Sequence, residues 1–557
     1  MLRATVIILL GSALYALPPP VPGGGVIERQ IEKEYEAKPL ELEKELPPVQ
    51  IDLPEEQLEM PEGISVRIDS VCIEGNQSFS CSEIQNWIEC CLHKELNLCD
   101  IYAICSIIDA EYAKRGYIVA RAYPPPQSIH QGCLKICILE GFVGAVEVKG
   151  NRFYKEEFIR SYFAKLIGKP LNYNQFMRAL LLLNENDDLR VGGVLNKGKE
   201  IGTVDIILPV EDHWPGHLYF NANNYGRKLT TNWRAGGRFD VGSLFTYGDK
   251  LSIAEVVGFP FNALYFTDVI YSAPIGRNGF RLYLSYLFSK FKVEEDLSLH
   301  LKGNSNIGTI KVSQAVIRNR TMSLDFSSWF DLMQIENIEL GQIVSFDKLR
   351  VLRFCTTWDH FSSPKGRDYL DFRMSVGIPY LFGGLSPVDS ECSRSGAGGE
   401  FVKFNLDYDR LQQLKWRDVF LMFHFSGQWS PYRLAIAEQL YLGGADTVRG
   451  YPLAAALGDS GYWGNLELHI PPPLLADLRF FVAKAKFREV CQLVAFIDQG
   501  GVFLQGGPTT FELGAGIGFR LNNLKGLSLS LDVGFPLMHN NLSTGAFTYI
   551  KVTGCPF

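Results

Sequence analysis

Apolar and polar residues alternate over long stretches after residue 215, and this alternation constrains the fold more than any other feature of the chain. In one segment every second side chain is apolar: Phe280, Leu282, Leu284, Tyr286 and Phe288. Successive side chains of a strand point to opposite faces, so this segment has one wholly apolar face. The same alternation recurs at residues 371–380, 402–408 and 527–537. The pattern predicts a series of amphipathic strands.

The number and length of these strands favour a closed barrel in a membrane. We count about sixteen of them, each long enough to cross a bilayer at a tilt, and no helical pattern to cover a sheet face. A soluble sandwich would turn the same apolar faces inward, so alternation alone leaves that alternative open. A closed sheet has no edges, and it can face lipid outside while its lumen stays polar.

The strand count depends on a few ambiguous segments, and an even number is expected. Segments near 309–317, 338–346 and 349–357 allow one pair of strands more or fewer. The connections alternate in length, and the two longest, 381–399 and 429–462, fall on the same side of the predicted barrel.

The start of the chain has the pattern of an export signal. Arg3 precedes an apolar run from Ala4 to Leu10 and then small residues, so residues 1–16 are expected to be a signal peptide. The run is too short for a membrane anchor. Overall, 54 Lys and Arg against 61 Asp and Glu give a net charge of −7, which argues against nucleic-acid binding.

Residues 17–62 are rich in Pro, Gly and Glu and are expected to be a linker. A helical candidate runs from Val26 to Glu45, but Pro39 interrupts it. We therefore predict a linker with at most a short charged helix.

Two small α+β units follow, at residues 63–141 and 142–212. They start alike, because a short strand ends in a Gly-Asn turn at Gly75-Asn76 and again at Gly150-Asn151. In the second unit, helical spacing at 158–166 and 176–183 and a cap at Asn172 precede two strand-like runs. The order is β-α-α-β-β.

Cysteines cluster in the first unit, since eight of the twelve lie within residues 72–137. This clustering suggests local disulfides or free buried thiols in an oxidising compartment. No pair of CxxC units occurs, so we expect no metal site, and we expect no cofactor.

Three motifs give this arrangement a family resemblance. The first lies at Gly116 to Gln127 and is followed by Leu139-Glu140-Gly141. The second runs from Gln439 to Gly461 and continues at Glu467-Leu468, and the third is Phe496-Ile497-Asp498-Gln499-Gly500. Together with the predicted barrel, these motifs resemble the two-partner secretion transporters. In that family, periplasmic units called POTRA domains precede an outer-membrane barrel.

The resemblance implies a fold and a set of site residues. The fold is an all-β transmembrane barrel of about sixteen antiparallel strands over residues 213–557, preceded by two α+β POTRA domains. A long sixth extracellular loop would fold into the lumen and carry Val448, Arg449, Gly450 and Tyr451. Arg449 would pair there with Asp498, on a barrel strand that also carries Phe496 and Gly500. Without the resemblance, Arg449 would be a solvated arginine in a surface loop.

Further implied roles concern the two ends of the mature chain. Partner recognition by the first POTRA domain would use Arg121, Tyr123, Pro125, Gln127, Glu140 and Gly141. The terminal Phe557 would belong to a signal read by the barrel assembly machinery, although Pro556 and Lys551 depart from the usual alternation. The family commonly plugs its pore with an amino-terminal helix, and Pro39 argues against a plug here.

The implied function is export of one large, unfolded partner protein of the filamentous adhesin or haemolysin type from the periplasm to the cell surface. The partner would bind by adding a strand to a sheet edge. Two alternatives remain open: a general factor that assembles outer-membrane proteins, and a passive porin.

An enzyme is not expected. Gly458-Asp459-Ser460-Gly461 resembles the nucleophile turn of chymotrypsin-like proteases, but it lies within a family loop. Gly514, Gly516 and Gly518 form a GxGxG on one face of a strand, where a dinucleotide motif would have to open a helix.

Overall fold

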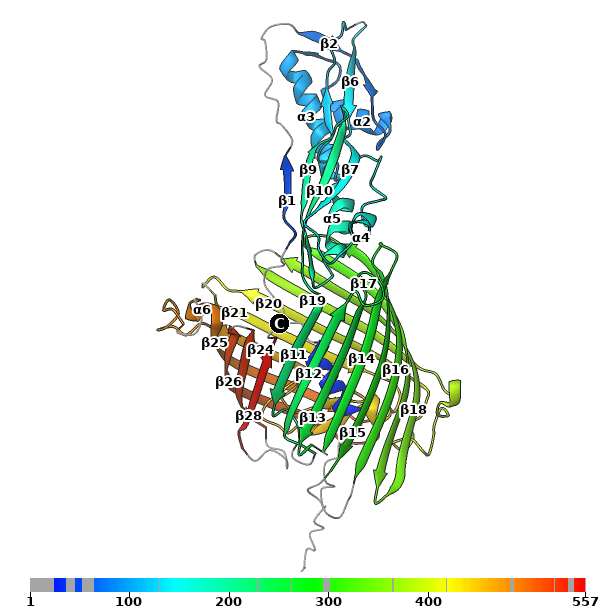
Figure 1. The fold of residues 1–557 in the computed structure, drawn as a ribbon, viewed down its shortest axis with the longest axis vertical. Helices are drawn as coiled ribbons and strands as arrows, with labels where there is room; N and C mark the ends of the chain where they lie inside the picture. The colour runs from blue at the N-terminus through cyan, green and yellow to red at the C-terminus, as the bar shows by residue number, and fades with distance from the viewer. Residues whose placement is uncertain are drawn as a thin grey trace, which may run out of the picture.

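The sequence predicts a barrel with two small domains in front, and the computed structural model has this architecture (Figure 1). The structure describes residues 25–36, 46–52, 65–129, 131–227, 230–261, 263–293, 301–362, 365–416, 418–480, 485–524, 526–538 and 545–555. The expected signal peptide at 1–16 and Phe557 lie outside these ranges. Within them, no helix combines the length and the hydropathy needed to span a bilayer.

The barrel is closed and has sixteen strands, which confirms the predicted fold. Each strand pairs antiparallel with the next, and Asn221 of the first strand pairs with Thr553 of the last. The ambiguous region of the sequence forms the three longest strands. The strands are β11 (Gly216–Asn223), β12 (Trp233–Gly242), β13 (Lys250–Phe259), β14 (Leu264–Ile275), β15 (Phe280–Lys292), β16 (Lys302–Arg318), β17 (Met322–Glu339), β18 (Gln342–Ser362), β19 (Gly366–Gly377), β20 (Phe401–Gln413), β21 (Phe420–Trp429), β24 (Ser460–Ile470), β25 (Cys491–Phe503), β26 (Thr509–Leu524), β27 (Leu527–Pro536) and β28 (Phe547–Gly554).

The two faces of the wall differ as the alternation predicts. On β15, Leu284 and Tyr286 are 43% and 52% exposed on the outer surface. Leu287 and Ser289 point the other way and are buried inside the barrel. An exposed apolar outer band is the surface that a transmembrane barrel presents to lipid.

The predicted alternation of connection lengths fails at one place. At the end of the barrel that carries the α+β domains, most connections are short, but the one between β24 and β25 spans residues 471–490. The two long loops at the opposite end, 378–400 and 430–459, are where the sequence places them.

The first α+β domain is a small sheet covered by two helices. Its central sheet has the order β3-β6-β5, and β2 pairs with β4 beside it. Ile84, Ile104, Ile108, Leu134 and Ile136 form its core. The elements are β2 (Val66–Ile68), β3 (Ser70–Glu74), α2 (Cys81–Ile88), η1 (Glu89–Cys91), β4 (Lys94–Leu96), α3 (Leu98–Lys114), β5 (Arg121–Tyr123) and β6 (Cys133–Leu139).

The second α+β domain has the same layout and rests on the barrel. As predicted, Asn172 caps its longer helix by accepting hydrogen bonds from the backbone of Asn174 and Gln175. The elements are β7 (Phe142–Lys149), α4 (Glu156–Ser161), α5 (Tyr173–Leu183), β8 (Leu189–Val191), β9 (Gly193–Lys197) and β10 (Thr203–Asp212).

A buried carboxylate braces the repeated Gly-Asn turn of each domain. Glu140 accepts hydrogen bonds from the backbone of Gln77 and Ser78, both at 2.8 Å, and from the Tyr112 hydroxyl at 3.0 Å. Asp212 accepts three backbone N–H groups at the second turn, from residues 152–154. Gly75 and Gly150 precede the two turns with φ of +86° and +99°. The repeated Gly-Asn turn therefore has the same kind of hydrogen bonding in both domains, from backbone N–H groups to a buried carboxylate.

Replacing Asp212 with alanine is expected to destabilise the second α+β domain by about 1–3 kcal/mol, because three N–H donors lose a charged acceptor. Burial alone would raise the pKa of Asp212, but these donors hold it below the ordinary value of an aspartate. The carboxylate therefore contributes stability above the unfolded pKa, and this contribution is lost as pH falls through the folded pKa. Hydrogen exchange of residues 142–212 in the full chain, at neutral and acidic pH, measures both effects. Equal protection in wild type and variant would contradict this role.

Of the two states that the clustering suggests, the eight cysteines of residues 72–137 are free thiols, and Cys105 is the one of the eight that is buried. Strand register explains this for the exposed group on β3 and β6. Cys72 pairs with Lys135, while Cys133 and Cys137 lie opposite Ser70 and Glu74. Cys72 is therefore diagonal to both Cys133 and Cys137, and this separation is beyond the usual reach of a disulfide.

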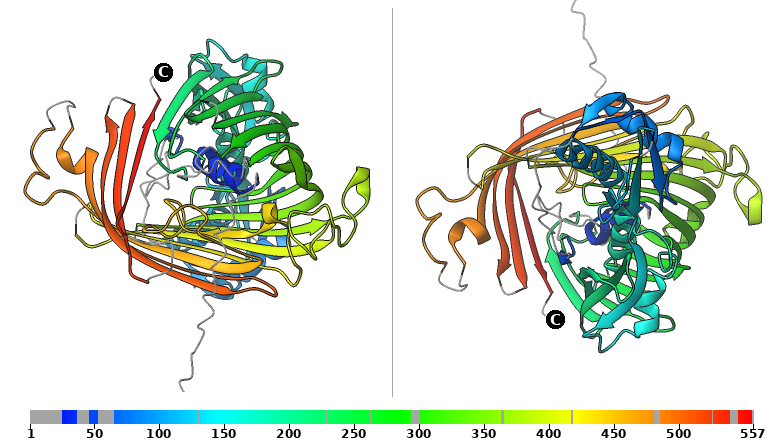
Figure 2. Two further views of the ribbon diagram at one scale, coloured as in Figure 1. Left: turned by 90° about the horizontal axis from the view of Figure 1, so that it is seen from below. Right: turned by 90° about the horizontal axis from the view of Figure 1, so that it is seen from above.

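Residues 17–62, predicted to be a linker with at most a short charged helix, contain one such helix and also a strand that was not predicted. Helix α1 (Val26–Glu36) lies inside the barrel, within the ring of strands in both end-on views (Figure 2). Strand β1 (Val49–Asp52) adds to the second α+β domain, parallel to β9. The helix is described as far as Glu36, and Pro39 lies outside the described residues.

Apolar and polar contacts hold α1 in the lumen. Ile27 and Ile31 are 4% and 1% exposed and belong to one cluster with Leu264, Phe266 and Phe291 of the barrel. The neighbouring Gln30 accepts a hydrogen bond from Arg234 Nη1 at 3.2 Å. The helix therefore lies in the lumen, and the inference from Pro39 against a plug does not hold.

Candidate functional site

The loop of residues 430–459, called the lumen loop here, enters the barrel from the end opposite the α+β domains. It contains η3 (Ile436–Glu438) and a small hairpin of β22 (Leu440–Leu442) and β23 (Ala456–Gly458). Leu442 and Val448 are fully buried. The hairpin carries residues 448–451 to the inner wall.

Arg449 is 4% exposed and makes a bidentate ion pair with Asp498 of β25. Its Nε and Nη2 donate to the two carboxylate oxygens at 2.8 and 2.9 Å, and its backbone N–H donates to Oδ2 at 3.0 Å. A planar guanidinium matches a carboxylate in this way, and a lysine ammonium does not. The structure thus brings together the two residues that the motifs predicted to pair.

Two further carboxylates surround the same guanidinium: Glu467, which belongs to the second motif but had no predicted role, and Asp532, which belongs to none of the motifs. Arg449 Nη1 lies 2.7 Å from Glu467 of β24 and 3.7 Å from Asp532 of β27. Its guanidinium carbon lies 3.4 Å from the ring centroid of Phe496. One buried cation therefore joins the lumen loop to three barrel strands.

The next two residues of the loop also hold it to the wall. The Tyr451 hydroxyl donates to the Met538 carbonyl at 2.7 Å and accepts a hydrogen bond from the Leu513 N–H at 3.3 Å. Tyr549 of β28 accepts from the Gly450 N–H at 3.1 Å and donates to the Tyr451 carbonyl at 3.0 Å. The loop tip thereby contacts the last strand of the barrel.

Glycines in the wall make room for this close approach. A Cβ at Gly514 would lie 1.9 Å from the Arg449 carbonyl oxygen, and one at Gly534 would lie 2.8 Å from the Gly450 nitrogen. Gly500 likewise leaves space for Leu442, which would lie 2.8 Å from an added Cβ. Gly514 belongs to the GxGxG excluded above as a dinucleotide motif. At this position its role is to seat the loop.

A second ion cluster holds the base of the lumen loop. Glu438 is 1% exposed, and its two oxygens lie 2.6 Å from Arg353 Nη2 and 2.6 Å from Lys403 Nζ. Arg353 also pairs with Asp331 at 2.6 Å. Three barrel strands, β17, β18 and β20, supply these partners.

The lumen loop touches the lumen helix directly. Gln30 Nε2 donates to Asp446 Oδ2 at 2.9 Å, and a Cβ on Gly25 would lie 2.5 Å from Ala437 Cβ. The two segments together occupy the inside of the barrel (Figure 2).

The serine of the protease-like turn lies within this packing. Ser460 Oγ donates to the Ser430 carbonyl at 3.2 Å and accepts from the Ser430 N–H at 3.0 Å. Asp459 is fully buried and accepts hydrogen bonds from the backbone of Leu434 and Gln505. Both residues anchor the loop.

Among the predicted recognition residues, Arg121 and Tyr123 lie on β5, an edge strand of the first α+β domain. Both are exposed there, Tyr123 by 40%. Pro125 lies in the following loop, and the Gln127 side chain pairs with the Lys135 backbone at 2.7 and 2.8 Å.

Glu140 and Gly141 have a different environment. Glu140 is 1% exposed and fully hydrogen-bonded. Gly141 has φ of +73°, and an added Cβ would lie 2.6 Å from Val119 Cγ2. The contacts of both residues are structural.

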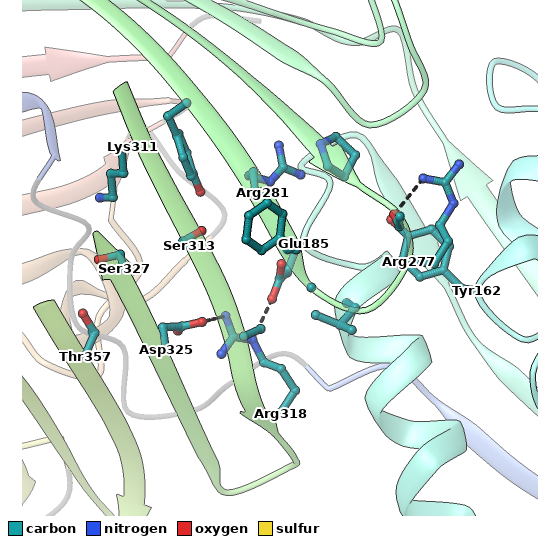
Figure 3. A pocket seen from close by; sticks show the side chains of 17 residues that line it. Tyr162, Glu185, Arg277, Arg281, Lys311, Ser313, Arg318, Asp325, Ser327 and Thr357 are labelled. Atoms are coloured by element: carbon teal, nitrogen blue, oxygen red, sulfur yellow. Dashed lines mark hydrogen bonds and ion pairs between the residues drawn. The ribbon is translucent and has the colours of Figure 1, made fainter. Parts of the chain in front are cut away.

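Ion pairs seat the second α+β domain on the rim of the barrel. Figure 3 shows Arg318 of β16 between Glu185 of that domain and Asp325 of β17, each at 2.7 Å. A cavity of about 220 Å³ opens beside them and is also lined by Arg281 and Lys311. Ion pairs therefore hold the second α+β domain on the barrel, and cationic side chains line the cavity beside them.

Comparison with known proteins shows which protein family has this architecture. Residues 202–521 match the family model "Haemolysin secretion/activation protein ShlB/FhaC/HecB", and residues 66–141 match "POTRA domain, ShlB-type". The chain is 24% identical over 489 residues to the Heme/hemopexin transporter protein HuxB of Haemophilus influenzae (strain 86-028NP), covering 84% of this chain and 82% of that protein.

Two further relatives extend the match. The Outer membrane transporter CdiB of Dickeya dadantii is 24% identical, covering 67% of each chain. The solved structure of CdiB from Escherichia coli superposes with a TM-score of 0.77 at 20% identity and covers 95% of both chains. The chain therefore belongs to the haemolysin secretion/activation protein family, outer-membrane transporters whose POTRA domains lie in the periplasm.

Proposed function

We propose that this protein exports a single large partner protein of the adhesin or haemolysin type and that the lumen helix and lumen loop close its channel between transport events. The observation that carries the proposal is the content of the lumen. Two segments fill it, and each is held by side-chain contacts and contributes no strand to the closed barrel sheet. A passive porin has no need of either segment or of two periplasmic domains.

Recognition of an unfolded chain is assigned to the sheet edges and the groove of the POTRA domains. β5 is a free edge with Arg121 and Tyr123 exposed beside it. A groove of about 750 Å³ lies between the two domains and is lined by Leu139, Ile167 and Ile201. An edge with apolar pockets beside it suits an extended peptide.

The edge of β9 already carries an extended segment, because β1 of the same chain occupies it. This pairing supports the view that the second POTRA sheet accepts added strands. We assign no recognition role to Glu140 or Gly141 and no catalytic role to any residue.

The proposed function can be tested by comparing the proteins that cells release into the medium with and without this gene. Deleting the gene in its own organism is expected to remove one large species from the culture medium, and wild-type protein is expected to restore it. Mass spectrometry of the medium and of purified outer membranes makes the measurement. Loss of many outer-membrane barrels would instead identify a general assembly factor, and an unchanged medium would identify a porin.

Insertion of the barrel itself is assigned to the barrel assembly machinery, which would read the end of the chain at Phe557. Outer-membrane lipid is the expected surroundings of the apolar outer face. The exposed band on β15, with Leu284 and Tyr286, supports this assignment.

A further inference from the structure

The described residues of the long connection between β24 and β25, 471–480 and 485–490, are called the rim segment here, and they lie at the periplasmic end of the barrel and outside its wall. It joins β24 to β25 and contains the short helix α6 (Phe487–Val490). α6 and its neighbouring loop project sideways from the barrel in Figure 1, and both end-on views place them beyond the ring of strands (Figure 2).

The rim segment covers part of the lipid-facing surface. On β25, Leu493 and Ile497 face outward and are 44% and 45% exposed. Cys491 has the same parity but is only 2% exposed, because Phe480 and Phe487 of the rim segment pack over it. Phe519 and Leu521 lie in the same cluster, on the outward-facing parity of β26.

The opposite surface of the rim segment is apolar and open. Leu474, Leu475 and Leu478 are 94%, 42% and 56% exposed. Trp416 on the adjoining turn is 73% exposed. That turn is tied to the rim segment by an ion pair between Asp418 and Arg488 at 3.1 Å. Exposed leucines beside a tryptophan, at the level where a barrel wall ends, are typical of the membrane–water interface.

The charges of the rim segment are mainly basic. Residues 471–490 contain Arg479, Lys484, Lys486 and Arg488 against Asp477 and Glu489. Arg488 is paired with Asp477 and Asp418. Arg479 and Lys486 are exposed, and Lys486 Nζ lies 3.9 Å from Asp477 Oδ1. Basic side chains next to inserted apolar ones suit a surface of anionic phospholipid headgroups.

We propose that the rim segment is an interfacial anchor in the periplasmic leaflet of the outer membrane. Leu474, Leu475 and Leu478 insert among acyl chains, and Arg479 and Lys486 contact the phosphates of anionic phospholipids. Because the segment is packed on β25 and β26, its insertion sets the height and tilt of this side of the barrel, and with them the direction in which the POTRA domains point.

Photocrosslinking of the full chain tests the proposal. The photoreactive residue benzoylphenylalanine replaces Leu474 or Leu478, and the protein is reconstituted in vesicles of seven parts phosphatidylethanolamine to three parts phosphatidylglycerol. Ile201 is the matched control, an aliphatic residue that is 92% exposed on the second POTRA domain. Irradiation is expected to attach phospholipid at 474 and 478 but not at 201. Heat-dependent migration in gels checks that each variant is folded.

The headgroup contact has its own readout in the same experiment. Phosphatidylglycerol is expected to exceed its mole fraction among the adducts. Replacing Arg479 and Lys486 with glutamine is expected to lower the ratio of phosphatidylglycerol to phosphatidylethanolamine adducts by up to about fivefold per charge removed, towards the ratio of the two lipids in the vesicle. Unchanged enrichment would overturn the headgroup contact. Crosslinks from 474 to a second copy or to a periplasmic protein, or equal lipid attachment at 201, would overturn the anchor.

Discussion

Replacing Arg449 with alanine is expected to reduce secretion of the partner to near background while the barrel still assembles in the outer membrane. The guanidinium contacts the carboxylates of Asp498, Glu467 and Asp532 at 2.8, 2.7 and 3.7 Å, and Arg520 also pairs with Asp532 at 2.6 Å. Removing Arg449 leaves the buried Asp498 carboxylate without a cationic partner among the described residues, a loss of about 3–5 kcal/mol for one broken pair. The loop tip then leaves the wall. Partner in the medium and heat-dependent migration of the barrel are the two measurements.

Two other variants separate this explanation from a general effect of mutating the loop. Arg433 is an exposed arginine of the same loop, and its replacement by alanine is expected to leave secretion unchanged. Arg449→Lys keeps the charge but cannot form the bidentate pair, so intermediate secretion is expected. Wild-type secretion by Arg449→Ala, or an equal loss in the Arg433 variant, would contradict the role of the ion cluster.

The barrel could be predicted from the sequence because its signal is local. Alternation with period two fixes which side chains of a strand share a face, and it holds through β15, β20 and β27. The pairing of Arg449 with Asp498 followed from motifs. Glu467 and Asp532 could not be assigned to the same cluster, because that requires the register between strands, which places Asn465 opposite Asp498 and Gly518 opposite Asp532.

The position of the helix in the lumen could not be predicted, for a different reason. A proline such as Pro39 limits a helix equally in a linker and inside a barrel, and the sequence does not show what surrounds the residues before it. Val26, Ile27 and Ile31 form a short apolar stripe that a barrel wall and a loop can cover together. The rim segment shows the same limit, because an apolar stretch between two strands does not reveal on which side of the wall it folds.

Introducing charge into the lumen helix is expected to open the channel. Ile27 and Ile31 pack against apolar barrel residues, so Ile27→Asp with Ile31→Asp would bury two carboxylates without partners at several kcal/mol each. The helix avoids this penalty by leaving the lumen. Planar-bilayer recordings are expected to show a larger resting conductance than wild type, and cells are expected to admit bulky antibiotics. Ile51→Asp is the matched control, since Ile51 is 53% exposed on β1.

The helix variant also distinguishes the two segments that fill the lumen. Expelling α1 removes the contact between Gln30 and Asp446 but leaves the cluster around Arg449 in place. We therefore expect higher conductance with secretion retained, the reverse of the Arg449→Ala result, in which secretion is lost. An unchanged conductance, or equal opening by Ile51→Asp, would show that α1 is not the barrier. If both activities failed together in either variant, helix and loop would act as one unit, and the separate roles assigned to them would be wrong.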